Sequence, residues 1–460
     1  MKRFCTLLFT ALLLTAALCV NASASRYDSA AQDLAAIGMF RGTGSGFDLD
    51  RAPTRSEAAI MLVRLYGAED QAKAAYGAGE IKHPFTDVSA YTAPYVAWLY
   101  TKGITNGTST ATFGSSQACT LQNYIVFLLR ALDYKDGTDF QYAQATDLAQ
   151  TCGFYSPLLY EGTFLRDDLA ALTYQALAAN VKDTDTSLLS SLIASGAIDK
   201  TAAQPLTDKI NAYRALVQST RGMESGSMDL DTVAHMDMTI QADGETTSSK
   251  MTTVGSTQSI VNGSDIRMAV TSKVTADDGS TTESGSWLKD GWLYISTTAG
   301  GETSKIKLAA GSDLAELEDL VQLPDLNVSG LAMVKSISTR RSGSDTVYTL
   351  VISQSSVNSL LDSTLSGMLD GMVDADGITT SSQASDVTGI YTVSSQGVLK
   401  ELCAAYSTTI HFSIPATADS PAQTMDMTCA YDTTITVKAT GSAVKVTYPN
   451  LSGFVEIDMG

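Results

Sequence analysis

The chain is poor in cysteine, histidine and basic residues, and each shortage excludes a class of protein. Its 460 residues include six cysteines and three histidines. Cys5 and Cys19 lie in a predicted leader, which leaves four, too few for a disulfide-stabilised scaffold of this length. The histidines show no paired ligand spacing, so no zinc site is expected. With 30 basic and 49 acidic residues the net charge is −19, which argues against nucleic acid as a partner.

Long apolar runs are confined to the start of the chain. The stretch MKRFCTLLFTALLLTAALCVNASA places two basic residues before an apolar run and ends in Ala22-Ser23-Ala24. This pattern predicts a secretory signal peptide at 1–24, so we expect an exported protein. Beyond it no run reaches the about 18 apolar residues of a membrane-spanning helix. Loss of the leader changes the charge to 28 − 49 = −21, so any anionic ligand must be held by a few local arginines.

Motifs for catalysis and for cofactors are also missing. The run GTGSG at 42–46 has no preceding strand and no Lys-Ser or Lys-Thr end, so it does not match a phosphate loop. The phrase DADG from Asp374 to Gly377 resembles part of a calcium loop, but Met372 and Gln383 occupy the first and last ligand positions. Titratable residues do not gather in a catalytic motif. We therefore predict that the protein is not an enzyme and binds no metal or cofactor.

The stretch APTRSEAAIMLVRLYG, Ala52 to Gly67, combines a helix cap with an unexplained arginine. Thr54 and Glu57 have the spacing of a capping box, and the apolar residues that follow share one helical face. Arg55 is different, because a cation in the first turn faces the positive end of the helix dipole. With free N–H groups beside it, the guanidinium would form a cradle for a carboxylate or phosphate. The tetrad is therefore either a cap alone or part of an anion-binding site.

The tetrad stands at the head of a helix in each of three internal repeats. The arginine returns in the third copy, where the threonine cap is lost. Capping alone would instead keep the threonine and let the arginine vary. The three tetrads are Thr54-Arg55-Ser56-Glu57, Thr120-Leu121-Gln122-Asn123 and Leu165-Arg166-Asp167-Asp168. The comparison favours a binding role for the first and third copies and leaves the second in doubt.

Four phrases carry a resemblance to a known family: APTRSEAAIMLVRLYG, PFTDV, PYVAWLYTKGITNG and FLRDDLAALTYQAL. In order and spacing they resemble the S-layer homology domain, of which three copies normally follow one another. The resemblance covers Arg26 to Val181 and implies an all-helical, pseudo-threefold bundle. In that family, grooves between the copies bind cell-wall carbohydrate, often a polymer with pyruvate ketals. The polymer-binding residues expected from the resemblance are Thr54, Arg55, Glu57, Arg166 and Asp168.

The second half of the chain is rich in strand patterns. Alternating runs of Thr, Val and Ile fill most of it, and SGSWLKDGWLYIST predicts a hairpin with Asp290-Gly291 as its two-residue turn. One helix is expected from Thr207 and another in SVNSLLDSTLSGMLDGMV. These elements predict an α+β domain with a long antiparallel curved sheet and packed helices. Cys403 and Cys429 fall in neighbouring runs and either pair or remain small buried thiols.

This order of elements is similar to the half-barrel family of lipoprotein carriers, in which a curved sheet closed by helices encloses an apolar cavity. The similarity implies that an apolar stripe on the second helix lines a pocket for a lipid-like ligand. The stripe consists of Leu360, Leu361, Leu365, Met368, Leu369 and Met372. The alternative is that these residues simply pack against the sheet.

Together these patterns predict an exported bacterial surface protein. The repeats would hold it non-covalently on secondary cell-wall polysaccharide or modified peptidoglycan, without a transmembrane segment. The second half would be a ligand carrier, a structural or adhesion module that binds no small molecule, or an unrecognised cell-envelope hydrolase. The predicted segments are a leader at 1–24, repeats at 26–80, 81–138 and 139–181, a linker at 182–206 and the α+β domain at 207–460.

Overall fold

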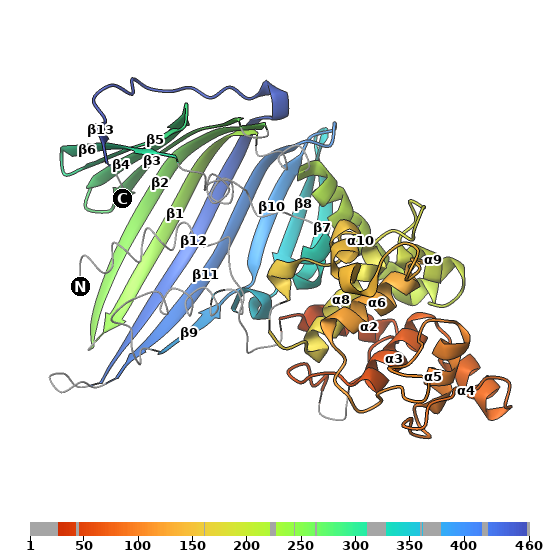
Figure 1. Ribbon diagram of the computed structural model, residues 1–460. Helices are drawn as coiled ribbons and strands as arrows, with labels where there is room; N and C mark the ends of the chain where they lie inside the picture. The colour runs from red at the N-terminus through yellow and green to blue at the C-terminus, as the bar shows by residue number, and fades with distance from the viewer. Residues whose placement is uncertain are drawn as a thin grey trace. The chain divides into compact units, whose positions relative to one another are not determined.

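The computed structural model describes most of the chain after the predicted leader, which lies outside the described residues. The described ranges are 26–42, 46–160, 162–220, 227–242, 244–262, 265–310, 328–358, 361, 379–415 and 422–457. They belong to two compact units, a helical unit that runs to Arg214 and a strand unit that begins at Ala215 (Figure 1). The predicted succession of an all-helical region and a sheet domain is confirmed.

The helical unit repeats an arrangement of helix, loop and helix. The second helix of the first two copies begins where predicted, because Thr54 and Thr120 each accept a hydrogen bond from the backbone N–H three residues on. At Thr54 the Glu57 side chain completes the predicted capping box. The helices are α2 (Asp28–Ala36), α3 (Arg55–Leu65), α4 (Glu69–Gly77), α5 (Ala93–Thr101), α6 (Leu121–Ala131), η1 (Tyr142–Gln144), α7 (Ala145–Thr151), η2 (Pro157–Leu159) and α8 (Arg166–Ala178).

Helix α8 lies at the centre of the helical unit. All 13 of its residues are buried, and it contacts α2, α6 and α9 (Leu188–Ala194). Polar groups on it are paired inside the core. The Tyr174 hydroxyl donates to Asp33 at 2.8 Å, and Thr173 shares a 2.6 Å hydrogen bond with Tyr124. Because the helix has no solvent face, its apolar residues occur all round it and not in one stripe.

The segment predicted as a linker, 182–206, is helical. It contains α9 and the first turns of α10 (Lys200–Thr220), which starts before the predicted Thr207 because Asp199 accepts a hydrogen bond from the Ala202 N–H at 2.8 Å. Pro205 lies inside α10. Leu188, Leu189 and Leu192 of α9 are buried, so this segment adds to the helical core.

A short segment from the second half also belongs to the helical unit. The 3₁₀ helix η4 (Val328–Met333) contacts α2 and α8, and its Leu331 and Ala332 are buried. Nothing in the sequence pattern predicted this, because six residues are too few to show a period.

Within its described ranges, the strand unit contains one 13-stranded sheet. The pairs from β6 to β8 along the sheet are antiparallel and β13 pairs with β6 in parallel, and the long central strands β1, β2, β11 and β12 run side by side (Figure 1). The strand order is β13-β6-β5-β4-β3-β2-β1-β12-β11-β10-β8-β7, with β9 paired to β11. The strands are β1 (Met228–Ala242), β2 (Glu245–Asn262), β3 (Asp265–Ala276), β4 (Thr281–Lys289), β5 (Trp292–Ala299), β6 (Glu302–Ala309), β7 (Val334–Ser342), β8 (Asp345–Ile352), β9 (Thr379–Ala384), β10 (Val387–Val393), β11 (Leu399–Ile414), β12 (Gln423–Thr440) and β13 (Val455–Glu456).

The predicted hairpin is confirmed. Strands β4 and β5 are joined by Asp290 and Gly291, whose φ angles are 51° and 77°. Two successive positive φ values are those of a type I′ turn, whose twist matches that of the flanking strands. The turn sets Trp287 opposite Tyr294 on the sheet.

The predicted apolar stripe lies mostly outside the described residues. Residues 354–358 and Leu361 are helical, and Val357 is buried. The other five stripe positions and the DADG phrase are not among the described residues. The stripe therefore stays a prediction, both as a pocket and as core.

Cys403 and Cys429 do not pair. They lie on neighbouring strands, but Cys403 is opposite Thr434 and Cys429 is opposite Thr408. Five rows of the ladder therefore separate them, about 17 Å at about 3.3 Å per residue, whereas a disulfide needs Cα atoms about 4.4–6.8 Å apart. Both are free thiols, and Cys429 is buried.

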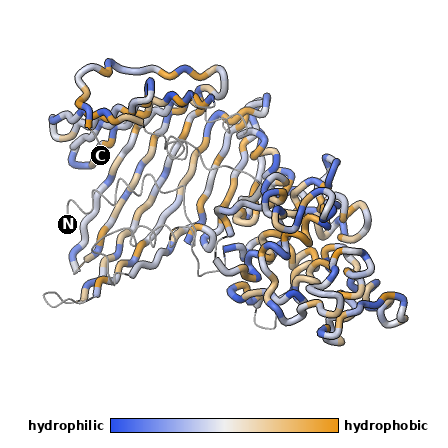
Figure 2. Tube along the Cα trace, viewed as in Figure 1, coloured by the Kyte–Doolittle hydropathy of each residue, from blue (hydrophilic) through white to orange (hydrophobic). Residues whose placement is uncertain are grey.

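Hydropathy follows the two kinds of fold (Figure 2). Apolar residues gather inside the helical unit and alternate along the long strands, as a half-buried sheet requires. One sheet face carries a cluster of Met236, Ile410, Phe412, Met427 and Cys429. None of the helices in the described ranges has both the length and the apolarity needed to cross a lipid bilayer.

The buried position of α8 makes a stability prediction. Leu172→Ala should lower the free energy of unfolding by about 2–5 kcal/mol, because the fully buried side chain leaves a cavity. Leu148→Ala, in partly exposed α7, is the matched control and should be much milder. Denaturant unfolding of the full chain, followed by helical circular dichroism, measures both. Equal losses would contradict a central α8.

Candidate functional site

Arg55 is held at the contact between the first and second copies. Its backbone N–H donates to the Gln117 carbonyl at 3.0 Å, and its Nε donates to the Phe113 carbonyl at 2.9 Å. The neighbouring Ser56 N–H donates to the Ser115 carbonyl at 3.3 Å. These bonds join the start of α3 to the loop before α6, and they leave Arg55 only 5% exposed.

The guanidinium of Arg55 has aromatic neighbours but no acidic partner. Its Cζ lies 5.1 Å from the ring centre of Phe113 and 5.8 Å from that of Phe127. Within the described ranges, no carboxylate forms an ion pair with it and no hydrogen bond engages its Nη atoms. Burial lowers the pKa of Arg55, because desolvation disfavours its charge. An anion entering from solvent would stabilise this cation.

Arg166 repeats the geometry at the contact between the third and first copies. Its backbone N–H donates to the Arg51 carbonyl at 2.9 Å, and its Nε donates to the Phe47 carbonyl at 3.0 Å. Arg51 and Phe47 of the first copy correspond in the repeat to Gln117 and Phe113 of the second, which accept from Arg55. Its Cζ lies 5.0 Å from the ring centre of Phe40. The two contacts are thus related by the internal repeat.

Arg166 differs from Arg55 because it has an acidic partner. Its Nη1 donates to Glu57 Oε1 at 3.1 Å. Glu57 also accepts hydrogen bonds from both Nη atoms of Arg51, at 3.0 and 2.5 Å, and from the Thr54 N–H at 2.8 Å. Burial raises the pKa of Glu57, but these hydrogen bonds and the two guanidinium charges outweigh it and lower the pKa to about 2. The carboxylate therefore stays ionised and fixes both arginines.

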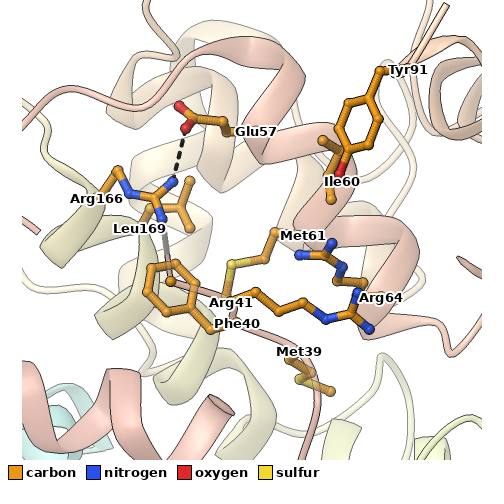
Figure 3. Close-up of a pocket in the computed structure, with 11 residues that line it drawn as sticks. Met39, Phe40, Arg41, Glu57, Ile60, Met61, Arg64, Tyr91, Arg166 and Leu169 are labelled. Carbon is orange, nitrogen blue, oxygen red and sulfur yellow. Dashed lines mark hydrogen bonds and ion pairs between the residues drawn. The ribbon is translucent and has the colours of Figure 1, made fainter. Parts of the chain in front are cut away.

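A pocket of about 320 Å³ lies beside Arg166, and residues from all three copies line it (Figure 3). Arg41 and Arg64 add two guanidinium groups, which pair with Glu69 at 3.2 and 3.0 Å. Tyr91, from the loop before α5, is 66% exposed. The lining residues are Met39, Phe40, Arg41, Gly42, Glu57, Ile60, Met61, Arg64, Tyr91, Arg166 and Leu169. This mixture of arginine and apolar side chains suits a ligand with both an acidic group and a ring face.

The five predicted polymer-binding residues fall into three places. Thr54, Glu57 and Arg166 lie together, and Figure 3 shows Arg166 reaching Glu57 across the pocket wall. Arg55 faces the second copy instead. Asp168, also in the first turn of α8, contacts Leu165 and Arg26 instead. The five predicted polymer-binding residues therefore do not form one cluster.

Asp168 is 3% exposed and is held from two sides. It accepts hydrogen bonds from the Leu165 N–H at 2.8 Å and from Arg26 Nη2 at 3.3 Å. Burial raises the pKa of Asp168 to about 6 in spite of these donors. A contact between Asp168 and a polymer stays a prediction.

The second copy presents neutral groups at its tetrad. Asn123 Oδ1 accepts a hydrogen bond from the Tyr142 hydroxyl at 3.1 Å, and Gln122 Nε2 donates to the Tyr142 carbonyl. Leu121 carries no donor at the position of the arginine. The departure of this copy from the arginine pattern thus removes a charge from its contact with the third copy.

Several residues of the site were not predicted from the sequence. Arg51 lies three residues before Thr54, outside the tetrad, and its role depends on the bend of the loop. Arg41, Arg64 and Tyr91 come together only through packing of the copies. Phe47 and Phe113 occupy equivalent positions in the first and second copies. This equivalence could have indicated that their carbonyls play the same role.

The ion pairs of Glu57 predict a pH-dependent stability. Glu57→Gln should lower the free energy of unfolding by about 1–3 kcal/mol at pH 7, because glutamine keeps the cap but loses the charge. The folded-state pKa lies below the ordinary 4.5, so this contribution is present above about pH 4.5 and is lost as the pH falls towards about 2. Denaturant titrations at pH 7 and pH 3 measure it. An equal difference between variant and wild type at both pH values would contradict the ion-pair role.

The strand unit has structural neighbours of low similarity. They include a DUF1329 family protein from Desulfovibrio piger, with 11% identity, 51% of this chain and 95% of that chain covered, and a TM-score of 0.17. A LolA superfamily protein from Nitrosomonas europaea has 10% identity, 50% and 96% coverage, and a TM-score of 0.14. Similarity at this level carries no information about a ligand.

The chain has a sequence relative, and its helical unit has a family match. A protein described as "Cell surface protein" from Thermoanaerobacter kivui is 31% identical over 157 residues, which are 33% of this chain and 20% of that protein. The chain thus spans only a fifth of the length of this relative. The family model described as the S-layer homology domain matches residues 84–121, within the second predicted copy. The chain therefore carries an S-layer homology domain, as its repeated phrases predicted.

Proposed function

We propose that the helical unit holds the protein on the bacterial cell wall by binding acidic wall polysaccharide through Arg55 and Arg166. The observation that carries the proposal is the guanidinium of Arg55, which is 5% exposed, fixed through Nε, and without an acidic partner among the described residues. A carboxylate on the polymer, such as a pyruvate ketal, would supply the missing charge and accept a bidentate hydrogen bond.

The family match supports the general role. An S-layer homology domain implies cell-wall anchoring, and it indicates, together with the surface-protein relative, a location at the bacterial cell surface. The nature of the polymer is the finer part of the proposal. The secondary cell-wall polysaccharide and modified peptidoglycan both offer acidic groups on sugar rings.

The pocket beside Arg166 would form a second contact with the polymer. There, Arg41, Arg64 and Arg166 surround an opening of about 320 Å³, while Glu57 and Glu69 already neutralise part of their charge. We therefore assign Thr54 and Glu57 the task of fixing Arg166, and Arg55 the stronger contact. Asp168 would act behind the binding surface because it is buried.

Modest contacts would be enough for firm retention. A charge-assisted hydrogen bond contributes about 1.5–3 kcal/mol. A wall polymer repeats its acidic groups, so a second contact gains from a high effective concentration. Local arginines must do this work against the negative net charge of the chain.

The strand unit would be the part that the anchor presents. Its role as a carrier of a lipid-like ligand stays a prediction, because the stripe that would line the pocket lies mostly outside the described ranges. The proposed role of the chain is binding, and we expect no catalytic activity from it.

The double variant Arg55→Met and Arg166→Met tests the proposal. It should lower the affinity for purified bacterial cell walls about 10- to 100-fold, because methionine keeps the packing stem but loses the charged donors. Sedimentation with the walls at increasing protein concentration measures it. Leu121→Met is the matched control at the same tetrad position. Retention of the double variant at wild-type affinity, with unchanged circular dichroism, would refute the proposal.

The two arginines should also contribute unequally. Arg55→Met alone should weaken wall binding more than Arg166→Met alone, because Glu57 already neutralises Arg166. Mild acid treatment of the walls, which cleaves ketals, should remove this difference along with the binding. A larger effect of Arg166→Met would mean that the pocket, and not Arg55, is the main contact.

A further inference from the structure

Glu57, the acidic residue of the first tetrad, is held by two arginines. Asp168, the acidic residue of the third tetrad, has no arginine at either of the two corresponding positions. Arg51 and Arg166 donate to Glu57. The position of Arg51, three residues before the tetrad, is Gly162 in the third copy. Arg166 reaches Glu57 from a neighbouring copy, and the copy that stands in the same relation to the third is the second, where Leu121 occupies the position of the arginine. Neither can donate a guanidinium to an acid at the start of α8.

Arg26 lies where such a guanidinium is needed. Its Nη2 is 3.3 Å from Asp168 Oδ1, and the exposed fractions of the two side chains are 8% and 4%. Arg26 comes from the segment before α2, far in sequence from the tetrad that it serves. A buried carboxylate left without a partner would destabilise the fold.

We infer that Arg26 replaces the arginine that the second copy has lost, so that the N-terminal segment of the helical unit completes the contact at the third tetrad. Arg26 is on this view a positioning residue, which acts on α8 through Asp168. The inference concerns the assembly of the repeats and does not depend on polymer binding.

The backbone holds Arg26 in this position. The N–H groups of Arg26 and Tyr27 donate to the two carboxylate oxygens of Asp167 at 2.6 and 3.1 Å. Tyr27 is 1% exposed, donates its hydroxyl to the Leu159 carbonyl at 3.2 Å, and stacks on Tyr160 with ring centres 6.2 Å apart. The segment is therefore fixed along its length and not only at its charge.

The charges at this contact do not favour an anionic ligand. Asp168 pairs with the guanidinium of Arg26, and Asp167 accepts only backbone N–H groups of the same segment, whereas Arg55 forms no ion pair in the described ranges. The three tetrads thus differ in charge, and the acidic residue of the third is paired with Arg26 of the same chain. Of the three tetrads, only the first and third would therefore offer an arginine to a wall polymer.

A pH-dependent stability measurement separates this role from simple packing. The groups that face Asp168 are Arg26, Tyr27 and Tyr160 from other elements and Asp167 from its own helix. Burial raises the pKa of Asp168 to about 6. Well below that pH the acid is neutral and needs no arginine, and the contribution of Arg26 to stability grows as the pH rises through that value.

The test uses Arg26→Met in the full chain, because methionine keeps the stem over Tyr27. The midpoint of thermal unfolding of the helical signal should fall by about 5–10 °C at pH 7.5 and by less than about 3 °C at pH 4.5. Asp168→Asn in the same chain should abolish this dependence on pH. Equal losses at both pH values would overturn the inference, because they would mean that Arg26 acts by packing alone.

A rescue variant tests the replacement itself. Leu121→Arg, added to Arg26→Met, should restore at least half of the lost stability at pH 7.5, because residues 121 and 168 are the repeat counterparts of Arg166 and Glu57, which form an ion pair. Leu121→Lys is the matched control and should restore less, since it lacks the fork. Absence of rescue by the arginine in a chain that folds at pH 4.5 would overturn the inference. Wall binding should be unchanged in the rescued chain, which separates this test from that of the proposed function.

Discussion

The helical unit depends on a hydrogen bond that crosses from one repeat to the next. An arginine at the start of a helix donates Nε to the carbonyl of a loop phenylalanine, once from Arg55 to Phe113 and once from Arg166 to Phe47. The bond uses one of the N–H donors of the guanidinium and buries its positive charge. Because a buried cation is unfavourable without a counter-charge, each such contact needs a carboxylate from the protein or from a ligand.

The copies meet this need in different ways. Arg166 finds Glu57, which a second arginine and the helix cap hold in its ionised form. Arg55 forms no ion pair in the described ranges, since Asn123 stands at the corresponding position of the second copy, and only the more distant charge of Asp87 acts on it. Arg55 thus lacks an ion pair because the second copy differs in sequence from the first. The same divergence left Asp168 without its arginine, and a residue from outside the tetrads now pairs with it.

The sequence predicted the features that follow local rules. The capping box at Thr54, the repeat with its helix starts and the Asp290-Gly291 turn all depend on residues a few positions apart. The side chain of Arg55 takes no part in the cap and donates to the Phe113 carbonyl of the second copy.

Features that depend on distant contacts could not be predicted. Arg51 and Arg26 reach their acids through loop bends and copy packing, and η4 joins the helices from a position far along the chain. The predicted linker proved helical because Asp199 starts α10 early and α9 buries leucines. Strand register, which no pattern gave, separated Cys403 from Cys429.

The most direct measurement is a crystal structure of the chain with a wall saccharide that bears a pyruvate ketal. We expect the ketal carboxylate within hydrogen-bond distance of the Nη atoms of Arg55, with the sugar ring against the neighbouring phenylalanine. A saccharide that binds the helical unit without touching Arg55 would contradict the claim that the unpaired guanidinium is the anchor.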